Sequence, residues 1–347
     1  MNIGVLGGGQ LALMLAQAAK QLNHNVIIWD PNKTACAQHC GRFINAAFSD
    51  TNALKSFLEN VDVVTWEFEN LPLKIIEKIE QKVPLYPAFS LLKIKRDRLT
   101  EKQHFMELNI PVAPFYPVNT HCEIQKFPVL LKKRFDGYDG KGQYLLKTAS
   151  DLKKISHLIT PNTFIAETVI PFDTELSIIG TRDSKGKINT YDLVQNTHCH
   201  GILHTSTVIP NSPYYTQAKS YLSQLMTHHQ YVGTLAIELF LVKNKLIINE
   251  CAPRVHNTGH WTIEGAKTSQ FENHIRAITN HTLGPTTTKK YPAMINIIGT
   301  SISKSDNEPD TYLHHYGKEK KPGRKLGHIT IVPNSNLRRN ELLIKYQ

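Results

Sequence analysis

The first thirty residues constrain the fold of this chain more than any other segment. A short apolar run over 3–6 is followed by three consecutive glycines, Gly7 to Gly9, and then by an amphipathic segment over 11–22. A second apolar run over 25–30 ends at Pro31. A buried strand, a glycine turn, a helix and a second strand, in this order, are typical of the opening of a parallel sheet. We therefore expect an α/β fold that begins with such a sheet.

The pattern changes after residue 127. Before it, the run 61–68 predicts a strand with carboxylates at its C-terminal end, where open α/β sheets bind ligands. Prolines at 84, 87, 111, 114 and 117 bracket a helical stretch over 91–109 and mark the change to the next unit. Beyond residue 127 the pattern predicts strands over 128–134, 143–146, 163–169, 175–180, 188–194, 234–242 and 245–250, with helices over 149–157 and 264–281.

Composition limits the classes of binding partner and the cellular compartment that we expect for this protein. The 347 residues carry 40 Lys and Arg against 29 Asp and Glu, a formal net charge of +11. The positive residues are dispersed, which favours small phosphorylated anions over nucleic acid. No apolar stretch approaches the ~18 residues of a membrane helix and no signal peptide is visible, so we expect no membrane partner. Five cysteines without C-x-x-C spacing fit a reducing cytoplasm. The pairs His228-His229 and His314-His315 lack metal-site spacing and are interpreted as surface or core histidines.

The first glycine turn has three interpretations. Gly7 to Ala12 loosely satisfies G-x-G-x-x-A, and Asp30 lies 21 residues after Gly9, where a dinucleotide-binding fold places its ribose carboxylate. An NAD-dependent oxidoreductase is therefore one candidate. Any other phosphate can also bind the amides at a helix N-terminus, and a tight strand–helix turn without a ligand is the third interpretation.

A second glycine-rich segment covers 137–143, between two predicted strands. Three glycines in six positions let the backbone approach a polyphosphate, and Lys132 and Lys141 supply cations. No helix follows directly and G-K-[ST] is missing, so we expect a flap between antiparallel strands rather than a Walker loop. A plain hairpin is the alternative.

Two carboxylates are predicted to face each other. A hairpin centred on Asn244 would place 242 opposite 246, 240 opposite 248, and Glu238 opposite Glu250, with Cβ atoms ~5 Å apart. Two like charges flanked by apolar residues repel each other unless a cation lies between them. Mg²⁺ is commonly held by one or two carboxylates plus substrate phosphates, and Asn249 could add an oxygen. Exposed carboxylates on a polar strand face are the alternative.

Two polar segments complete the candidate site. The run 252–261 follows a buried strand, and its Arg254 is suited to a bidentate oxyanion clamp. The segment 318–325 places four lysines and Arg324 on a loop kinked by Pro322 and Gly323, for which a solvated basic loop is the alternative.

Taken together, five motifs carry a resemblance to a known family. They are Gly-Gly-Gly-Gln-Leu at 7–11, the loop 137–143, Asn249-Glu250, Pro-Arg-Val-His-Asn-Thr-Gly-His-Trp at 253–261 and Pro-Gly-Arg-Lys-Leu-Gly-His at 322–328. Over nearly its whole length the chain resembles the 5-(carboxyamino)imidazole ribonucleotide synthases of the ATP-grasp superfamily. The resemblance implies an ATP-grasp fold, α+β overall. It has a Rossmann-like domain over 1–97, a central lid subdomain with the glycine loop over 98–165, and a C-terminal antiparallel-sheet domain over 166–347.

The resemblance also implies a ligase of purine biosynthesis. ATP and bicarbonate would give carboxyphosphate, which carboxylates the amine of 5-aminoimidazole ribonucleotide and releases ADP and phosphate. Magnesium would bridge the ATP phosphates to the protein, since phosphoryl transfer is mostly positioning and charge neutralisation. A cytoplasmic homodimer is the family expectation.

Residues can be assigned to these roles by the same resemblance. The metal ligands would be Glu238 and Glu250. The catalytic residues would be Asp139, Lys141, Arg254 and Lys318. The substrate nucleotide would meet Gln10, Leu11, Glu67, Arg254, His256, Asn257, Lys318, Arg324 and Lys325. The ATP site would comprise Arg98, Lys132, Gly137, Tyr138, Asp139, Gly140, Lys141, Gly142, Gln143, Glu167, Thr168, Val169, Ile170, Glu175, His198, Asn249 and Glu250, with 167–170 as the hinge that meets adenine and Glu175 as the ribose acceptor.

Three positions depart from the family pattern. Leu13, Lys141 and Lys321 stand where arginine is frequent, and lysine keeps the charge but loses the bidentate fork. Besides the oxidoreductase, the alternatives are a sister ATP-grasp enzyme that transfers a formyl group from formate, and a nucleotide-binding regulator without activity.

Overall fold

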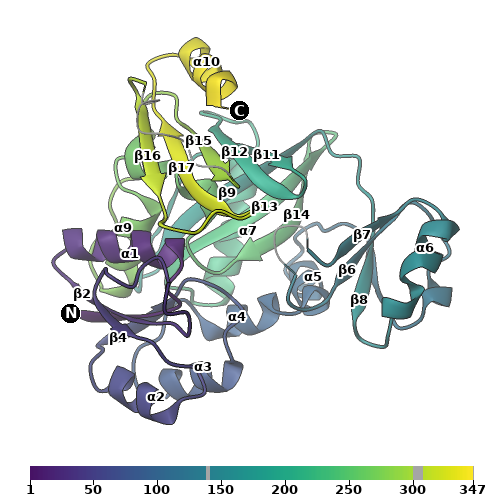
Figure 1. Cartoon of the computed structure of the whole chain (residues 1–347). Coiled ribbons are helices and arrows are strands. Elements are labelled where there is room, and N and C mark those ends of the chain that lie inside the picture. The colour runs from purple at the N-terminus through teal and green to yellow at the C-terminus, as the bar shows by residue number, and fades with distance from the viewer. Residues whose placement is uncertain (138–140, 300–307, 347) are drawn as a thin grey trace.

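A four-stranded parallel sheet forms the N-terminal part of the molecule (Figure 1). The structure is a computed structural model that describes residues 1–137, 141–299 and 308–346. The strand order is β3-β2-β1-β4, and the strands are β1 (Asn2–Leu6), β2 (Asn25–Trp29), β3 (Arg42–Ile44) and β4 (Val63–Trp66). The predicted opening of the chain, a strand, a glycine turn, a helix and a parallel strand, is confirmed.

Helices cover this sheet with their apolar faces. They are α1 (Gln10–Gln21), α2 (Thr51–Leu58) and α3 (Leu73–Glu80). Leu11, Met14 and Leu15 of α1 are buried in one core cluster with residues of β1 and β2, and Phe57 of α2 is buried in a second cluster. The spacing of apolar residues three and four apart gives α1 a continuous buried face. This packing fixes the N-terminus of α1 at the C-terminal edge of the sheet.

The predicted helix over 91–109 is two helices, α4 (Phe89–Lys95) and α5 (Arg98–Glu107). The helix is interrupted between them because Asp97 takes an extended conformation and caps α5, accepting the Leu99 N–H at 3.0 Å. Arg134 binds the same carboxylate from another element. A single-helix interpretation was therefore wrong: Asp97 is a local N-cap that starts a second helix, and only its contact with Arg134, 37 residues away, is long-range.

A small antiparallel sheet stands apart at the right of Figure 1. Its order is β5-β8-β6-β7, and its strands are β5 (Phe115–Val118), β6 (Val129–Lys133), β7 (Gln143–Leu146) and β8 (Phe164–Thr168). Helix α6 (Ala149–Ile155) packs on it through Leu152 and is followed by the 3₁₀ turn η2 (Ser156–Leu158). The segment 137–143 joins β6 to β7, as predicted.

Within the described residues the largest sheet has nine strands, all of them C-terminal to the small antiparallel sheet. Its main order is β14-β13-β9-β11-β12-β15-β17-β16, with β10 paired to β9. The strands are β9 (Thr174–Arg182), β10 (Ile188–Thr190), β11 (Val194–Cys199), β12 (Ile202–Val208), β13 (Gly233–Val242), β14 (Lys245–Ala252), β15 (Ala293–Ile298), β16 (Thr311–His315) and β17 (Lys325–Ile331). The pairs that join neighbouring strands of this sheet are antiparallel.

Helices α7 (Tyr215–His228) and α9 (Gln270–Ile278) pack on β9 and β13. Helix α10 (Asn336–Tyr346) closes the C-terminal end, and α8 (Thr262–Gly265) is a single turn. Two predictions needed correction here. The helix over 264–281 is interrupted, because Ser269 caps α9 in an extended conformation, and the strand over 188–194 divides into β10 and the start of β11. Within the described ranges, no helix has the length and apolar character needed to span a membrane.

Candidate active site

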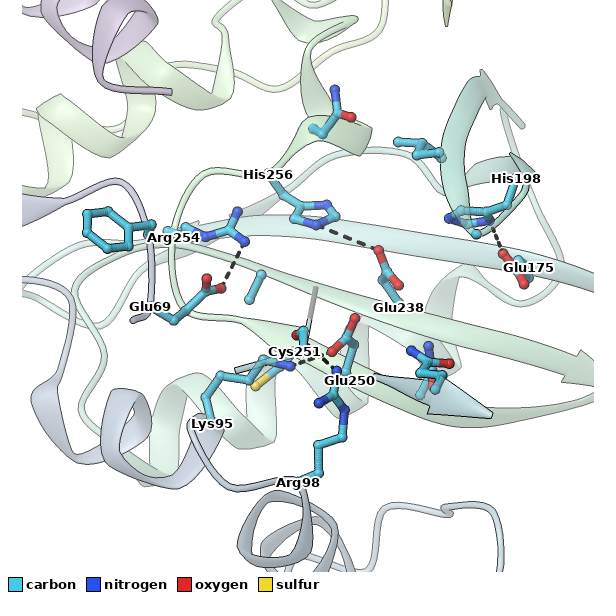
Figure 2. A pocket seen from close by; sticks show the side chains of 18 of the residues that line it. Glu69, Lys95, Arg98, Glu175, His198, Glu238, Glu250, Cys251, Arg254 and His256 are labelled. Carbon is cyan, nitrogen blue, oxygen red and sulfur yellow. Dashed lines mark hydrogen bonds and ion pairs between the residues drawn. The ribbon is translucent and has the colours of Figure 1, made fainter. Parts of the chain in front are cut away.

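A cleft of about 650 Å³ lies between the three sheets, and its walls come from all of them. Figure 2 shows Glu238 and Glu250 facing each other in the middle, with Arg254 and Glu69 on one side and His198 and Glu175 on the other. Many of the predicted residues line this cleft, although they come from distant parts of the chain. These are Gln10, Leu11, Glu67, Arg98, Lys132, Gly137, Gln143, Glu175, His198, Glu238, Asn249, Glu250, Arg254, His256, Asn257 and Lys325.

The first glycine turn is held by the protein's own carboxylates. The Gly8 N–H donates to Asp30 at 2.6 Å, and the Gly9 N–H donates to Glu67 at 2.7 Å. Glu67 comes from the end of β4, and a Cβ on Gly9 would lie only 2.7 Å from its Oε2. Burial raises the pKa of Glu67, and the amides of Gly9 and Ala12 oppose that shift. Both carboxylates thus occupy the amides that a dinucleotide pyrophosphate would need, which counts against the oxidoreductase interpretation.

The two predicted metal carboxylates face each other, but the strand pairing that brings them together differs from the predicted one. The turn has two residues, Lys243 and Asn244, both with positive φ, so Val242 faces Lys245 rather than residue 246. The pairing continues one residue out of the predicted register as far as Leu239 and Ile248. A bulge at Asn249 then shifts the register and places Glu238 opposite Glu250. The pair was predicted correctly, whereas the predicted pairs 242/246 and 240/248 were wrong.

Glu250 is held as an anion by a partly buried lysine. Lys95, at the end of α4, approaches Glu250 at 2.6 Å and Glu101 at 3.2 Å. Burial alone would raise the pKa of Glu250, but Lys95 and Arg98 hold it well below its usual range. Glu101 is 2% exposed and accepts the Cys251 N–H at 2.8 Å. The cleft floor therefore carries a fixed negative charge whose counter-charge comes from two helices.

Glu238 behaves differently from its partner. Burial, together with the charge of Glu250, raises the pKa of Glu238 to about 7. The ring of His256 lies 3.6 Å from it, and burial holds the pKa of His256 well below its usual value. Near neutral pH, Glu238 is thus partly protonated while Glu250 keeps its charge. Two carboxylates with the amide oxygen of Asn249 beside them form an oxygen donor set of the kind that Mg²⁺ takes.

A second acid–base pair lies at the far end. His198 on β11 forms an ion pair with Glu175 on β9, and the two strands are neighbours in the sheet. Burial works against the charged ring, but Glu175 outweighs it and raises the pKa of His198. The rings of Phe172 and Phe240 stack nearby at 4.7 Å and also line the cleft. This end combines flat apolar surface with polar groups.

The predicted hinge Glu167 is tied down by two lysines. Lys132 lies 3.0 Å and Lys102 3.3 Å from its carboxylate oxygens, and all three side chains are almost fully buried. Lys132 also reaches Asn249 at 3.4 Å. These residues line a small cavity next to the main cleft. The side chain of Glu167 is therefore committed to the two lysines.

Arg98 connects helix α5 to the glycine-rich loop. Its guanidinium donates to the carbonyl oxygens of Lys133 at 2.9 Å and of Gly137 at 3.0 Å. A Cβ on Gly137 would lie 2.6 Å from the Arg98 Nη1, so a larger residue here would displace the guanidinium from the loop. Tyr138, Asp139 and Gly140 lie outside the described residues, and the roles predicted for them stay predictions.

At the other end of the cleft, the cations are paired with groups of the protein. Arg254 binds Glu69 at 2.9 Å, and its buried Nε has no hydrogen-bond partner among the residues that the structure describes. Lys318 donates to the Gln10 Oε1 at 2.6 Å, and burial lowers the pKa of Lys318. The basic loop is thus docked against α1 rather than solvated throughout. In the described chain, Lys141, Gly142, Thr168, Val169, Ile170, Lys318 and Arg324 are not among the residues that line the main cleft.

Models of known families match three segments of the chain. The ribonucleotide synthetase preATP-grasp domain matches residues 1–96, the ATP-grasp domain residues 103–271, and the phosphoribosylaminoimidazole carboxylase C-terminal domain residues 292–341. The N5-carboxyaminoimidazole ribonucleotide synthase of Pseudomonas aeruginosa is 41% identical over 339 residues, which cover 95% of this chain and 94% of that protein. The chain belongs to the N5-carboxyaminoimidazole ribonucleotide synthase family.

Solved structures of this family have the same fold. The Thermus thermophilus synthetase superposes with a TM-score of 0.93 at 39% identity, covering 99% of this chain and 96% of that one. The Aspergillus clavatus synthase, in complex with ADP and 5-aminoimidazole ribonucleotide, gives 0.86 at 25% identity, covering 98% and 96%. The expected α/β ATP-grasp fold and the expected family are confirmed, and the chain is an ATP-grasp ligase.

Sequence analysis did not identify the residues that hold the charged groups of this ATP-grasp site in place. Lys95, Glu101 and Lys102 sit on the two helices that were predicted as one, and Glu69 follows the β4 strand. Their roles depend on contacts with residues more than 60 positions away, as in the pairs Lys95–Glu250 and Lys102–Glu167. The one local signal was the cluster of carboxylates after β4, which pointed to the position of Glu69.

Proposed function

We propose that this enzyme carboxylates the amine of 5-aminoimidazole ribonucleotide with ATP and bicarbonate. A bicarbonate oxygen attacks the γ-phosphorus, the bond to the ADP oxygen breaks, and carboxyphosphate forms. The amine nitrogen then bonds to the carboxyl carbon, the bond between that carbon and the phosphate oxygen breaks, phosphate leaves with the electron pair, and the amine releases one proton. The observation that carries the proposal is the opposed pair Glu238 and Glu250, lying between a cationic nucleotide end and the Arg254 end in one cleft (Figure 2).

The nucleotide end is proposed to hold ATP. Arg98 and Lys132 bring positive charge to the cleft wall next to the glycine-rich loop, and Lys141 belongs to the same loop. Phe172 and Phe240 offer an apolar platform close to Glu175, the proposed ribose acceptor. The full proposed set is Arg98, Lys132, 137–143, 167–170, Glu175, His198, Asn249 and Glu250.

Glu238 and Glu250 are proposed to hold Mg²⁺, with Asn249 beside them. The raised pKa of Glu238 is the property of a carboxylate pair that is short of a cation, and this feature supports the ion. When bound, Mg²⁺ would neutralise charge on the ATP phosphates. Lys95 keeps its contact with Glu250 from the other side and fixes the direction of that carboxylate.

The opposite end is proposed to hold the ribonucleotide. Gln10 and Leu11 at the start of α1, with Glu67, Arg254, His256 and Asn257, would surround it, and Lys318, Arg324 and Lys325 would supply charge for its phosphate. Asp139, Lys141, Arg254 and Lys318 are the proposed catalytic residues for the carboxyl transfer. The family further suggests a cytoplasmic homodimer and the division 1–97, 98–165 and 166–347.

The test is ADP release from Mg-ATP in carbonate-depleted buffer. We expect ADP only when both 5-aminoimidazole ribonucleotide and bicarbonate are added, together with an acid-labile carboxylated product. Formate replacing bicarbonate with full activity would overturn the proposal in favour of formyl transfer. ATP binding without turnover in any mixture would indicate a nucleotide-binding regulator.

A further inference from the structure

Three histidines meet at helix α5, outside the proposed active site. His104 lies on α5, His228 is the last residue of α7, and His229 caps that helix. One ring nitrogen of each lies within 4.8 Å of those of the other two. Within the described chain, none of the three lines the main cleft or the small cavity beside it. The sequence pattern alone indicates surface or core histidines for the pair 228–229, and the tertiary fold adds the third ring.

The rings are oriented as metal ligands are. The Nε2 atoms of His104 and His229 face each other at 2.9 Å. Their Nδ1 atoms point outward, that of His104 to the Glu107 carboxylate at 3.4 Å and that of His229 to the Ser90 hydroxyl at 2.9 Å. Histidines that bind metals usually have their second nitrogen held by a carboxylate, carbonyl or similar group, which fixes the ring. Both of the buried or half-buried rings have such a partner.

The protonation states also suit a ligand set. A carboxylate at the His104 Nδ1 keeps the proton there and leaves Nε2 as an acceptor, so the His229 Nε2 donates to it. A metal needs only that His229 move its proton to Nδ1, where the Ser90 hydroxyl can accept it. With these tautomers the Nε2 of both rings carries a free lone pair, as metal ligation requires.

The geometry points to a transition-metal site made by His104, His228 and His229 that joins α5 to α7. Three imidazoles suit Zn²⁺, Ni²⁺ or Co²⁺ rather than Mg²⁺, which prefers oxygen ligands. In a tetrahedral site with metal–nitrogen bonds of about 2.0–2.1 Å, neighbouring nitrogens lie about 3.3 Å apart, so His104 and His229 would separate by about 0.4 Å. His228 is exposed, so the fourth position opens to solvent.

The test is metal binding by the full-length protein without nucleotide. Zn²⁺ is titrated by calorimetry in excess Mg²⁺, which saturates oxygen-donor sites, and Co²⁺ is titrated by visible absorption. The variants are H228Q and H229Q. The matched control is H157Q, a histidine on the η2 turn in a different sheet unit. Thermal unfolding with and without Zn²⁺ gives an independent readout.

We expect one Co²⁺ to bind with a nitrogen-type spectrum, without a thiolate charge-transfer band. Affinity should fall at least about tenfold in H228Q and H229Q and stay unchanged in H157Q. Equal binding by all four proteins, or a thiolate band from the free cysteines, would overturn the proposal. Because His228 is exposed, H228Q decides the matter if H229Q does not fold.

Discussion

Lys95 offers the sharpest test of the charge network in the cleft. Replacing it with Met keeps the length of the side chain and removes the cation shared by Glu101 and Glu250. Glu101 is 2% exposed and would then lie beside Glu250 without its counter-charge. A buried carboxylate in this position takes up a proton rather than remain charged. We therefore expect Lys95→Met to lower the free energy of unfolding by an amount that depends on pH.

The magnitude follows from the cost of that proton. Holding a carboxyl group of ordinary pKa 4.5 in its neutral form at pH 7 costs about 2.5 × 1.36, or about 3.4 kcal/mol. Burial already raises the pKa of Glu101 in the native protein, so this figure is a ceiling. At pH 5 the same cost is at most about 0.8 kcal/mol. We expect a loss of about 2–3 kcal/mol at pH 7 that nearly disappears at pH 5.

The sign can be checked by linkage. The variant's native state holds a proton that the unfolded chain releases above pH 4.5, so its stability falls as pH rises from about 4.5 to 7. The assay is the urea midpoint of the variant relative to wild type at pH 5 and pH 7. Lys93→Met is the matched control on the same helix: its partner Glu77 lies at 3.1 Å with both side chains about half exposed, where an ion pair contributes ~0–1 kcal/mol. The double variant Lys95→Met/Glu101→Gln should recover most of the loss. A loss of equal size at both pH values, or no recovery, would refute the reasoning.

The remaining predictions concern the proposed chemistry. Glu250→Gln should abolish turnover while circular dichroism shows a folded protein; a near-normal kcat would remove Glu250 from the metal site. Because the pKa of Glu238 is about 7 without metal, the affinity for Mg²⁺ should rise between pH 6 and pH 8, and this slope should vanish in Glu238→Gln; a pH-independent affinity in wild type would contradict it. Lys318→Ala should raise the KM for the ribonucleotide or lower kcat, whereas Lys320→Ala, at an exposed position, should change neither; equal effects would make Lys318 an ordinary loop residue.

The sequence by itself determined the elements whose causes are local. Three glycines between apolar runs predict a strand–turn–helix unit, because the backbone conformation and the buried faces depend on residues within one or two turns. The run Pro253 to Trp261, together with the other four motifs, indicated the family, and the family in turn implied the fold. The carboxylates 238 and 250 were also found in the sequence, since the apolar residues of their strands indicate burial, and a buried pair of like charges is costly without a cation.

Only the tertiary structure decided how these charged groups are held. The opposition of Glu238 and Glu250 depends on a bulge at Asn249 that compensates a two-residue turn, and a hairpin count cannot see both. Lys95 became the counter-ion of Glu250 because the break at Asp97 aims α4 into the cleft. His104 meets His228 because the fold brings the end of α7 to α5, where the two rings lie 5.2 Å apart. Charged groups and metal ligands interact over a few ångströms in space. The distance between two residues along the chain does not tell which groups the packed core brings within that range.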